Sequence, residues 1–455
     1  MTGEWRKVKL GEVVSINPDT IGADWRYPYI KYIDISSVGE GTIVEPPRIL
    51  RLDEMPSRAR RLVQEGDTVL STVRPGRRAM FFVKHPEPEW VVSTGFAVLR
   101  PKREYIEPRY LYACVFDKEF TDFLVQREKG AAYPAVLPED IADAVISLPP
   151  LAEQRAIAHI LGALDDKIEL NRRMSETLEA IAHALFKAWF VDFEPVRAKR
   201  EGRWRRGHSL PGLPAHLYDH FPDRLVDSEL GEIPEGWEVV RLAQVVEINP
   251  ARPLCKEQVA PYLDMSGMPT RGHVPSHVVE RPYTSGARFA NGDTLLARIT
   301  PCLENGKTAF VDFLPPEGVG WGSTEFIVLR PKPPLPPEFG YCLARHPRFR
   351  EFAIQNMTGT SGRQRVQSEA LAHYLLVAPS EGVAKAFGQL VEPLFRKASQ
   401  SVAESRTLAA LRDALLPKLI RGEIRVKDAE RFLEGKGYEV RPREASPSQY
   451  APERV

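Results

Sequence analysis

The sequence predicts an α+β protein in which one unit, a globular domain followed by a long α-helix, occurs twice in tandem. Three observations predict this fold: collinear sequence matches about 230 residues apart, short β-branched segments in the first part of each copy, and a long helical segment at its end. A chain of 455 residues is also too long for one ordinary domain.

The duplication is visible in motifs that recur in the same order. Residues 5–18 read WRKVKLGEVVSINP, residues 237–250 read WEVVRLAQVVEINP, and both copies continue with a YxDxS motif. The later matches are GDT at 66–68 and 292–294, and STGFAVLRPK at 93–102 against STEFIVLRPK at 323–332. This repeat is far longer than the repeats of solenoid proteins, so it indicates the duplication of a whole domain. The alternative is that the two copies share a structure but no task.

The first part of each copy is predicted to be rich in β-strands. Residues 91–101 and 324–331 are β-branched runs bounded by Gly and Pro, and GDTVL and GDTLL are typical of a turn that enters a strand. Shorter helices are expected over 108–125 and 337–355.

A long helix is predicted to close each copy, from residue 152 to about 190 and from 383 to 420. Apolar residues recur there at spacings of three and four, so each helix carries one apolar stripe. Neither stripe can stay in water, and a coiled coil of the two helices is the simplest way to bury both; a coiled coil within a homodimer is the alternative. The stripe residues chosen for the spacer helices are Leu161, Leu164, Ile168, Leu178, Leu185, Leu390, Leu394, Leu408, Leu411 and Leu415.

These elements predict a domain plan with a connecting segment between the copies. The plan is a first globular domain (1–150), a helix (151–195), a linker (196–235), a second globular domain (236–380), a helix (381–425) and a tail (426–455). The linker begins VRAKREGRWRRGHS, with six Lys or Arg residues and one acid. A segment of this composition either contacts DNA phosphates or is solvated.

Composition narrows the class of protein. The formal net charge of +1 argues against a nonspecific polycation but leaves room for local basic patches. The four cysteines form no CxxC pair, so neither a zinc site nor a disulfide framework is expected. The sequence has no long uncharged apolar run and no N-terminal signal core, which favours a cytoplasmic protein that does not enter a membrane.

The chain lacks the motifs of common catalytic sites. Residues 305–308 (NGKT) resemble the end of a phosphate-binding loop, but Pro301 stands where that loop needs a Gly. The Asn-Pro dipeptides at 17–18 and 249–250 lack the aromatic residue of an amino-methyltransferase motif, and no S-adenosylmethionine loop or zinc-protease motif is present. We therefore expect a binding protein with no catalytic residue, metal or cofactor of its own; an enzyme with an unrecognised site is the alternative.

Basic loops in each copy are candidates for DNA contact, because cations bind phosphates and Arg, Gln and aromatic groups can reach bases. Residues 70–84 carry four cations and no acid, and residues 358–367 form a Gly-rich basic loop. Arg271 and His273 lie in another loop-rich stretch. The candidate contacts are Arg58, Arg60, Arg61, Arg74, Arg77, Arg78, Lys84, Lys129, Tyr133, Arg271, Arg288, Arg298, Lys307, Arg363, Gln364 and Arg365.

The two copies agree in the segments that read as scaffold and differ in these loops. PGRRAM in the first copy stands against PCLENGK in the second, and EKGAAYP stands against GTSGRQR. Two domains that share one scaffold but recognise different DNA sequences should show this pattern, because the scaffold is shared while the loops carry the function. For any single Arg, a solvated surface charge is the alternative.

Three segments resemble the specificity subunits of type I restriction–modification systems. They are residues 149–196, which begin PPLAEQRAIAHILGALDDKIELN, the stretch GLPAHLYDHFPDRLVDSELGEIPEGWE before the second copy, and LLPKLIRGEIRV at 415–426. The resemblance implies that each globular domain is a target recognition domain, and that the two helices pair antiparallel as a spacer. It implies that the domains read the two parts of a split, asymmetric site on double-stranded DNA.

The resemblance also implies partners for the chain. The helices would dock two methyltransferase (modification) subunits, which bind S-adenosylmethionine and take the target adenine out of the base stack. Restriction subunits that translocate DNA with ATP and Mg²⁺ would join the complex. The second helix begins APSEGVAKAFGQL and lacks the Glu-Gln-Arg of PPLAEQR, which leaves the symmetry of docking open. Two alternatives remain: a specificity protein that acts alone as a DNA-binding regulator, and a coiled-coil scaffold whose domains bind protein.

Overall fold

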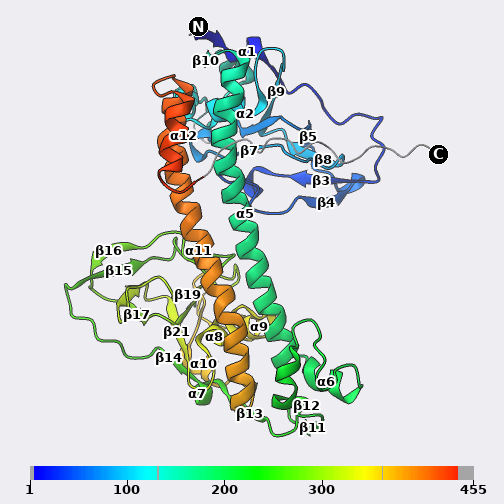
Figure 1. The fold of residues 1–455 in the computed structure, drawn as a ribbon, viewed down its shortest axis with the longest axis vertical. Coiled ribbons are helices and arrows are strands. Elements are labelled where there is room, and N and C mark those ends of the chain that lie inside the picture. Colours follow the sequence, from blue (N-terminus) through cyan, green and yellow to red (C-terminus); the bar gives the residue numbers. More distant parts are fainter. Residues whose placement is uncertain (1–4, 131–132, 361, 439–455) are drawn as a thin grey trace. The chain divides into compact units, whose positions relative to one another are not determined.

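The chain divides into two compact units in the computed structural model, which describes residues 5–130, 133–360 and 362–438 (Figure 1). Unit 1 comprises Met1–Ile168 and Thr407–Val455, and unit 2 comprises Glu169–Arg406. Both long helices cross this boundary, so each unit contains one globular domain and a part of each helix.

The globular domain of unit 1 is built on three antiparallel or mixed sheets. Their strand orders are β2-β9-β6-β7, β4-β3-β8-β5 and β1-β10, and β3 pairs with β8 in parallel. The strands are β1 (Arg6–Lys9), β2 (Val14–Ile16), β3 (Tyr29–Ile33), β4 (Arg48–Arg51), β5 (Ala59–Leu62), β6 (Thr68–Ser71), β7 (Met80–Phe82), β8 (Trp90–Ser93), β9 (Phe96–Pro101) and β10 (Val145–Leu148). The short helices are α1 (Leu10–Val13), α2 (Pro108–Phe116), α3 (Lys118–Val125) and α4 (Pro138–Ala142).

Three sheets of the globular domain of unit 2 repeat those of unit 1 strand for strand. Its sheets have the orders β14-β21-β18-β19, β16-β15-β20-β17 and β13-β24, and the parallel pair is again the equivalent one, β15 with β20. The strands are β13 (Glu238–Arg241), β14 (Val246–Ile248), β15 (Val259–Leu263), β16 (Val279–Pro282), β17 (Ala287–Ala290), β18 (Thr294–Ala297), β19 (Thr308–Phe310), β20 (Val319–Gly322), β21 (Phe326–Pro331) and β24 (Leu375–Ala378). The helices are α7 (Leu242–Val245), α8 (Pro337–Arg345), α9 (Pro347–Gln355) and α10 (Ser368–Ala372), and a short hairpin joins β22 (Met357–Thr358) to β23 (Arg365–Val366). The predicted duplication of a whole domain is therefore confirmed.

The shared GDT and VLRP motifs meet in a buried ion pair in each unit. In unit 1, Arg100 donates to both carboxylate oxygens of the buried Asp67, at 3.0 and 2.9 Å. In unit 2, Arg330 Nη1 lies 3.2 Å from Oδ1 of Asp293, and Arg252 binds the same carboxylate at 2.8 Å. A buried carboxylate without a cation is strongly destabilising, so the two motifs depend on each other.

The shared Asn-Pro motif marks a left-handed turn after β2 and after β14. Asn17 has φ 53°, and its side-chain oxygen accepts a hydrogen bond of 2.9 Å from the backbone N–H of Val98. Asn249 has φ 54° and binds the N–H of Val328 at the same distance. Asn tolerates this backbone conformation better than most residues, and its amide also satisfies a strand N–H.

Replacing Asn17 with alanine is expected to destabilise unit 1 by about 2 kcal/mol, because a strand N–H loses its partner and alanine is strained at positive φ. The Asn17→Gly variant relieves the backbone strain but not the lost hydrogen bond, so it should lie between alanine and wild type. Hydrogen exchange of the β2 and β9 peptides, together with urea unfolding, measures both effects. Equal protection in all three proteins would contradict this role of Asn17.

The two predicted long helices are present as α5 (Leu151–Phe190) and α11 (Glu381–Ile420), each of 40 residues. Their apolar stripes enter the cores of the units. In unit 1, Leu161 and Leu164 pack in one cluster with Leu408 and Leu415. In unit 2, the core gathers Phe186, Trp189 and Phe190 of α5 with Phe387, Val391 and Phe395 of α11. None of the ten predicted stripe residues is exposed.

The segment 196–235 is folded, although its composition predicted a linker. It contains most of α6 (Glu194–Arg200), a short 3-10 helix and the hairpin of β11 (Leu225–Ser228) and β12 (Gly231–Pro234). Trp204 is 1% exposed and packs with Leu217 and Phe221 in the core of unit 2. This segment has many surface cations, but a few large apolar residues anchor it in the core. Its overall composition therefore gave the wrong expectation of an unfolded linker.

The predicted tail also begins with ordered structure. Helix α12 (Val426–Glu434) buries Ala429 and Leu433 in the core of unit 1. The part of the tail from residue 439 on lies outside the described residues.

Candidate nucleic-acid interface

Two loops of unit 1 meet through backbone hydrogen bonds and bring four candidate residues together. They are the basic turn (72–78) and the tip segment of unit 1 (126–136, described apart from 131 and 132). The N–H of Arg74 donates to the carbonyl of Pro134 (2.8 Å), and the N–H of Val136 donates to the carbonyl of Thr72 (2.9 Å). This pairing gathers candidate residues from both loops, which are Arg74, Arg77, Lys129 and Tyr133.

These side chains differ in how far they reach into solvent. Tyr133 is 78% exposed, Arg77 is exposed, and Arg74 is half-buried. The Lys129 ammonium is exposed and lies 3.8 Å from Asp140. An exposed aromatic ring among cations suits the sugar, phosphate and base surfaces of a nucleic acid.

Unit 2 builds the same junction from different side chains. The N–H of Thr300 donates to the carbonyl of Gln364 (3.0 Å), and the N–H of Val366 donates to the carbonyl of Arg298 (3.0 Å). These bonds match those of the basic turn in unit 1, so the tip segment of unit 2 (356–366, described apart from 361) occupies the equivalent place. By this register Arg363, which is exposed, stands where unit 1 has Tyr133.

Several other candidate residues are engaged inside the chain. The Arg78 guanidinium donates to Glu40 (2.6 Å), to the Thr121 hydroxyl (2.8 Å) and to the carbonyl of Phe116 (2.6 Å). Arg365 donates to both carboxylate oxygens of Glu325 at 2.7 to 2.9 Å, and this contact holds the pKa of Glu325 below its usual value. The guanidinium groups of Arg78 and Arg365 are therefore both held by contacts within the chain.

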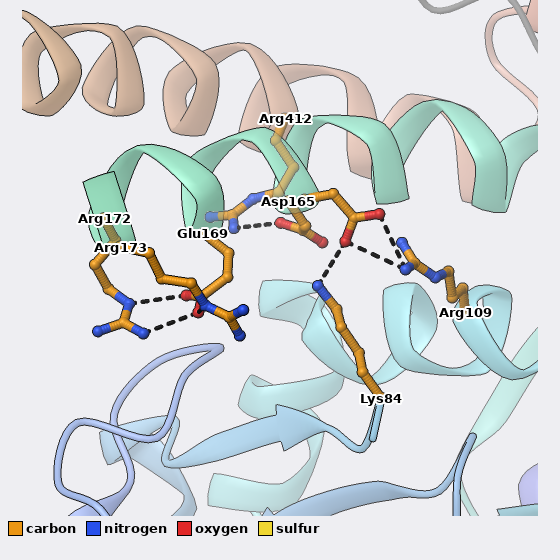
Figure 2. A network of polar contacts seen from close by, with 8 residues as sticks. Lys84, Arg109, Asp165, Glu169, Arg172, Arg173 and Arg412 are labelled. Atoms are coloured by element: carbon orange, nitrogen blue, oxygen red, sulfur yellow. Dashed lines mark hydrogen bonds and ion pairs between the residues drawn. The ribbon is translucent and has the colours of Figure 1, made fainter. Parts of the chain in front are cut away.

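Lys84 of unit 1 binds one of the long helices, α5 (Figure 2). Its ammonium lies 2.5 Å from Asp166 of α5, which also binds Arg109 at 3.1 Å. The neighbouring Asp165 of α5 pairs with Arg412 of α11 at 2.9 Å. Lys84 therefore joins the globular domain of unit 1 to the helix part of the same unit.

The remaining candidates have varied surroundings. Arg58 binds Asp34 at 2.9 Å and is exposed, while Arg60 is exposed on β5 beside Arg61, whose pKa is lowered by burial. In unit 2, Arg298 donates to Gln367 (2.5 Å) and Lys307 donates to the carbonyl of Met265 (2.6 Å). Arg271 is exposed, and Arg288 is half-buried over the ring of Tyr283. His273, from the same stretch as Arg271, is buried.

Gln154 of the PPLAEQR motif has a role inside unit 1 that the sequence did not reveal. Its side-chain oxygen accepts from the N–H of Glu107 (2.9 Å), and its amide donates to the carbonyls of Tyr105 and Pro149. At the corresponding place in the second helix, Ala384 packs in the core of unit 2. The two helices therefore make different contacts within the chain at this position.

Among the described residues, no group of three or more His, Cys, Asp and Glu side chains is placed to hold a metal ion. Within the same residues, the helices are all too short or too polar to span a bilayer.

The comparisons with known proteins agree with the duplicated architecture. Residues 2–180 match the family model of the type I restriction modification DNA specificity domain. The chain is 24% identical to the type I restriction enzyme HindI specificity subunit of Haemophilus influenzae, over 92% of this chain and 100% of that protein. It is 26% identical to the type I restriction enzyme MjaIX specificity subunit of Methanocaldococcus jannaschii, over 92% of this chain and 88% of that protein.

A solved structure shares the fold. The crystal structure of a type I restriction–modification system S subunit from M. genitalium is similar with a TM-score of 0.54 and 13% identity, over 92% of this chain and 96% of that one. The family model covers the first domain and much of the first helix, and the curated relatives extend the likeness over both copies. Residues 2–180 therefore match the type I specificity domain, and the chain is similar over both copies to type I restriction enzyme specificity subunits.

Proposed function

We propose that this chain reads a split, asymmetric site on double-stranded DNA, with one recognition domain for each part of the site. The observation that carries this proposal is the junction found in both units. The same backbone hydrogen bonds hold the two tip segments, yet Tyr133 and Pro134 in unit 1 stand where unit 2 has Arg363 and Gln364. A shared frame with different polar groups at its tip suits two readers of different base sequences.

The residue types at the tips fit direct readout. Arg and Gln can each make two hydrogen bonds to a base edge in the major groove, Arg to guanine and Gln to adenine. The exposed cations around them, Arg77 and Lys129 in unit 1, suit phosphates, which position a protein without reading sequence. The engaged residues Arg78 and Arg365 would then shape the tip rather than touch bases.

We infer that α5 and α11 pair antiparallel as a coiled-coil spacer. In unit 2, the Asn171 amide binds Glu404 (2.8 Å) and the Ser175 hydroxyl binds the carbonyl of Ala398 (3.2 Å), so residue numbers rise along one helix and fall along the other. A 40-residue helix is about 60 Å long, which would make the pair a ruler for the gap between the two parts of the site.

We further propose that the chain acts through partners in the cytoplasm and has no catalytic site. Two methyltransferase subunits would dock on the helices and supply S-adenosylmethionine, and restriction subunits would supply ATP and Mg²⁺. The ten stripe residues are buried or half-buried, so docking would use the exposed side of the helices.

Methylation mapping tests the proposal directly. The chain is expressed with its methyltransferase partner in a host without adenine methylation, and modified adenines are read by single-molecule sequencing. The expected result is one split motif with two specified parts and a fixed gap. No modification, despite a soluble complex with an active partner, would favour a DNA-binding regulator that acts alone or a protein-binding scaffold.

Arg77→Ala and Arg363→Ala are each expected to weaken DNA binding of the complex by roughly 3- to 10-fold and to lower the salt slope by about one ion. Both residues are exposed, so their loss should leave folding unchanged. Fluorescence anisotropy across a salt series measures affinity and slope. Arg224→Ala, a change at another exposed arginine beside the β11–β12 hairpin, is the matched control. Unchanged affinity in Arg363→Ala would remove the tip segment of unit 2 from the interface.

A further inference from the structure

His273 lies where the recognition domain of unit 2 meets both long helices. Its side chain is 1% exposed, and it belongs to the segment between β15 and β16. Nδ1 is 2.5 Å from Oε1 of Glu179 on α5, and Nε2 is 2.8 Å from the hydroxyl of Ser399 on α11. One imidazole ring therefore connects the domain to two helices.

The hydrogen-bond partners require a proton on each ring nitrogen. An ionised Glu179 only accepts, so Nδ1 must donate to it. The single hydroxyl proton of Ser399 goes to the carboxylate of Asp312, so the Ser399 oxygen is left to accept from Nε2. A ring that donates from both nitrogens is an imidazolium, and the two carboxylates on either side balance its charge.

The cluster extends to a second cation that holds the same segment. The hydroxyl of Tyr341 donates to Glu179 Oε2 (3.3 Å) and accepts from Arg345 Nε (3.0 Å). Arg345 also donates to the carbonyls of Thr270 (2.7 Å) and Gly272 (2.6 Å). The residues just before His273 are thus fixed from α8 while His273 itself is fixed from α5 and α11.

A short backbone path leads from His273 to the tip segment of unit 2. The carbonyl of His273 accepts from the N–H of Phe310 in β19, which pairs with β18. Strand β18 leads into Arg298, whose carbonyl accepts from the N–H of Val366 in the tip segment. A displacement of His273 from the helices would therefore be passed on through two strands to Arg363.

We propose that His273, as a buried imidazolium, is a positioning residue that fixes the recognition domain of unit 2 on α5 and α11 and so sets the direction in which its tip segment faces. This inference rests on the proposed DNA-reading function. Its consequence is that the charge on His273 keeps the complex selective for one gap length between the two parts of the DNA site.

The surroundings of His273 favour its charged form. The charged and titratable groups that face it are Glu179 and His183 from α5, Tyr341 and Arg345 from α8, and Asp312 after β19. Burial lowers the pKa of His273, but the hydrogen bonds and charges of Asp312 and Glu179 outweigh it and raise the pKa to about 9. In unit 1, the position equivalent to Asp312 is occupied by Lys84, which binds Asp166. Unit 1 therefore attaches its domain to the helix through a different contact.

The first experiment examines the charge. ¹⁵N NMR of the full chain labelled at histidine, with His273→Gln used to assign the signal, should show protons on both ring nitrogens of His273 at pH 7. A neutral tautomer, with one nitrogen unprotonated, would overturn the proposal whatever the DNA-binding result.

The second experiment examines positioning with the full chain bound to its modification subunits. Binding is measured on duplexes that carry the mapped site with its native gap, and with the gap changed by one base pair. Wild type should prefer the native gap by about tenfold or more, and His273→Gln should reduce that preference to about threefold or less, with His216→Gln, an exposed change, as control. Ser399→Ala, which keeps the histidine but removes one partner, replaces His273→Gln if that variant yields no soluble protein.

The outcomes separate the two proposals. Full gap preference in His273→Gln would overturn the positioning role while leaving the DNA-reading function intact. No preference for a split site in wild type would overturn the proposed function itself.

Discussion

Replacing Phe387 with alanine is expected to lower the free energy of unfolding of unit 2 by about 3–5 kcal/mol. Phe387 lies on α11 with 0% exposure, and its ring centroid is 4.9 Å from that of Phe190 and 6.3 Å from that of Phe186, both on α5. The substitution removes a large buried ring and leaves a cavity that the neighbouring aromatic rings can fill only in part. Urea unfolding followed by tryptophan fluorescence suits this measurement, because Trp189 lies 6.0 Å from the Phe387 ring.

The matched control is Phe432→Ala on α12, where the side chain is 46% exposed. Its cost should stay below about 1 kcal/mol, since nearly half of that side chain is already exposed to water. A Phe387→Ala variant as stable as the control would mean that α5 and α11 do not share a core in solution.

Between pH 6.5 and 9, wild type is expected to lose about 3 kcal/mol of stability relative to His273→Gln. The pKa of His273 is raised from 6.5 to about 9 in the folded chain. A raised pKa means that the folded state favours the cation. The stabilisation is therefore complete below pH 6.5, the pKa in the unfolded chain, and is lost as pH rises through 9.

Urea unfolding of both proteins at half-unit pH intervals measures this difference, and His216→Gln controls for the loss of any histidine. A constant difference between wild type and His273→Gln over that range would show that His273 is neutral in the folded chain. The experiment needs no DNA and no partner, so it stands independently of the proposed function.

The sequence predicted the features that depend on repetition and periodicity. Motifs such as GDT and VLRP recur because each unit needs the same buried ion pair. The residues that form this pair can be recognised directly in the sequence. The long helices were predicted within a few residues, since an apolar stripe of 40 residues depends only on local spacing. The topology of the sheets could not be predicted, because the pairing of β3 with β8 joins strands from distant parts of the chain.

The contacts that the candidate residues make within the chain could not be predicted, for a physical reason. Whether an Arg side chain is engaged in an ion pair depends on residues that are remote in sequence. No local sequence pattern predicts that Glu40 pairs with Arg78 or that Glu325 pairs with Arg365. His273 was grouped with Arg271 as a loop residue, yet it is buried between helices that lie far away in sequence. Trp204 and Phe221 are core residues that sequence reasoning also missed, because they lie in a segment whose charge suggested a linker.

Lys84 in unit 1 and Asp312 in unit 2 occupy equivalent positions but have different side chains. This difference affects how the gene for such a chain can change in evolution. Both residues follow matching strands, and the carbonyls of Val83 and Val311 just before them accept equivalent backbone bonds from Gly66 and Gly292. Lys84 meets an aspartate on its helix, whereas Asp312 meets a serine beside a cationic histidine. A gene rearrangement that exchanged the two domains would place each charge before the wrong helix. Such an exchange would therefore call for compensating changes on the helices, at Asp166 and at Ser399.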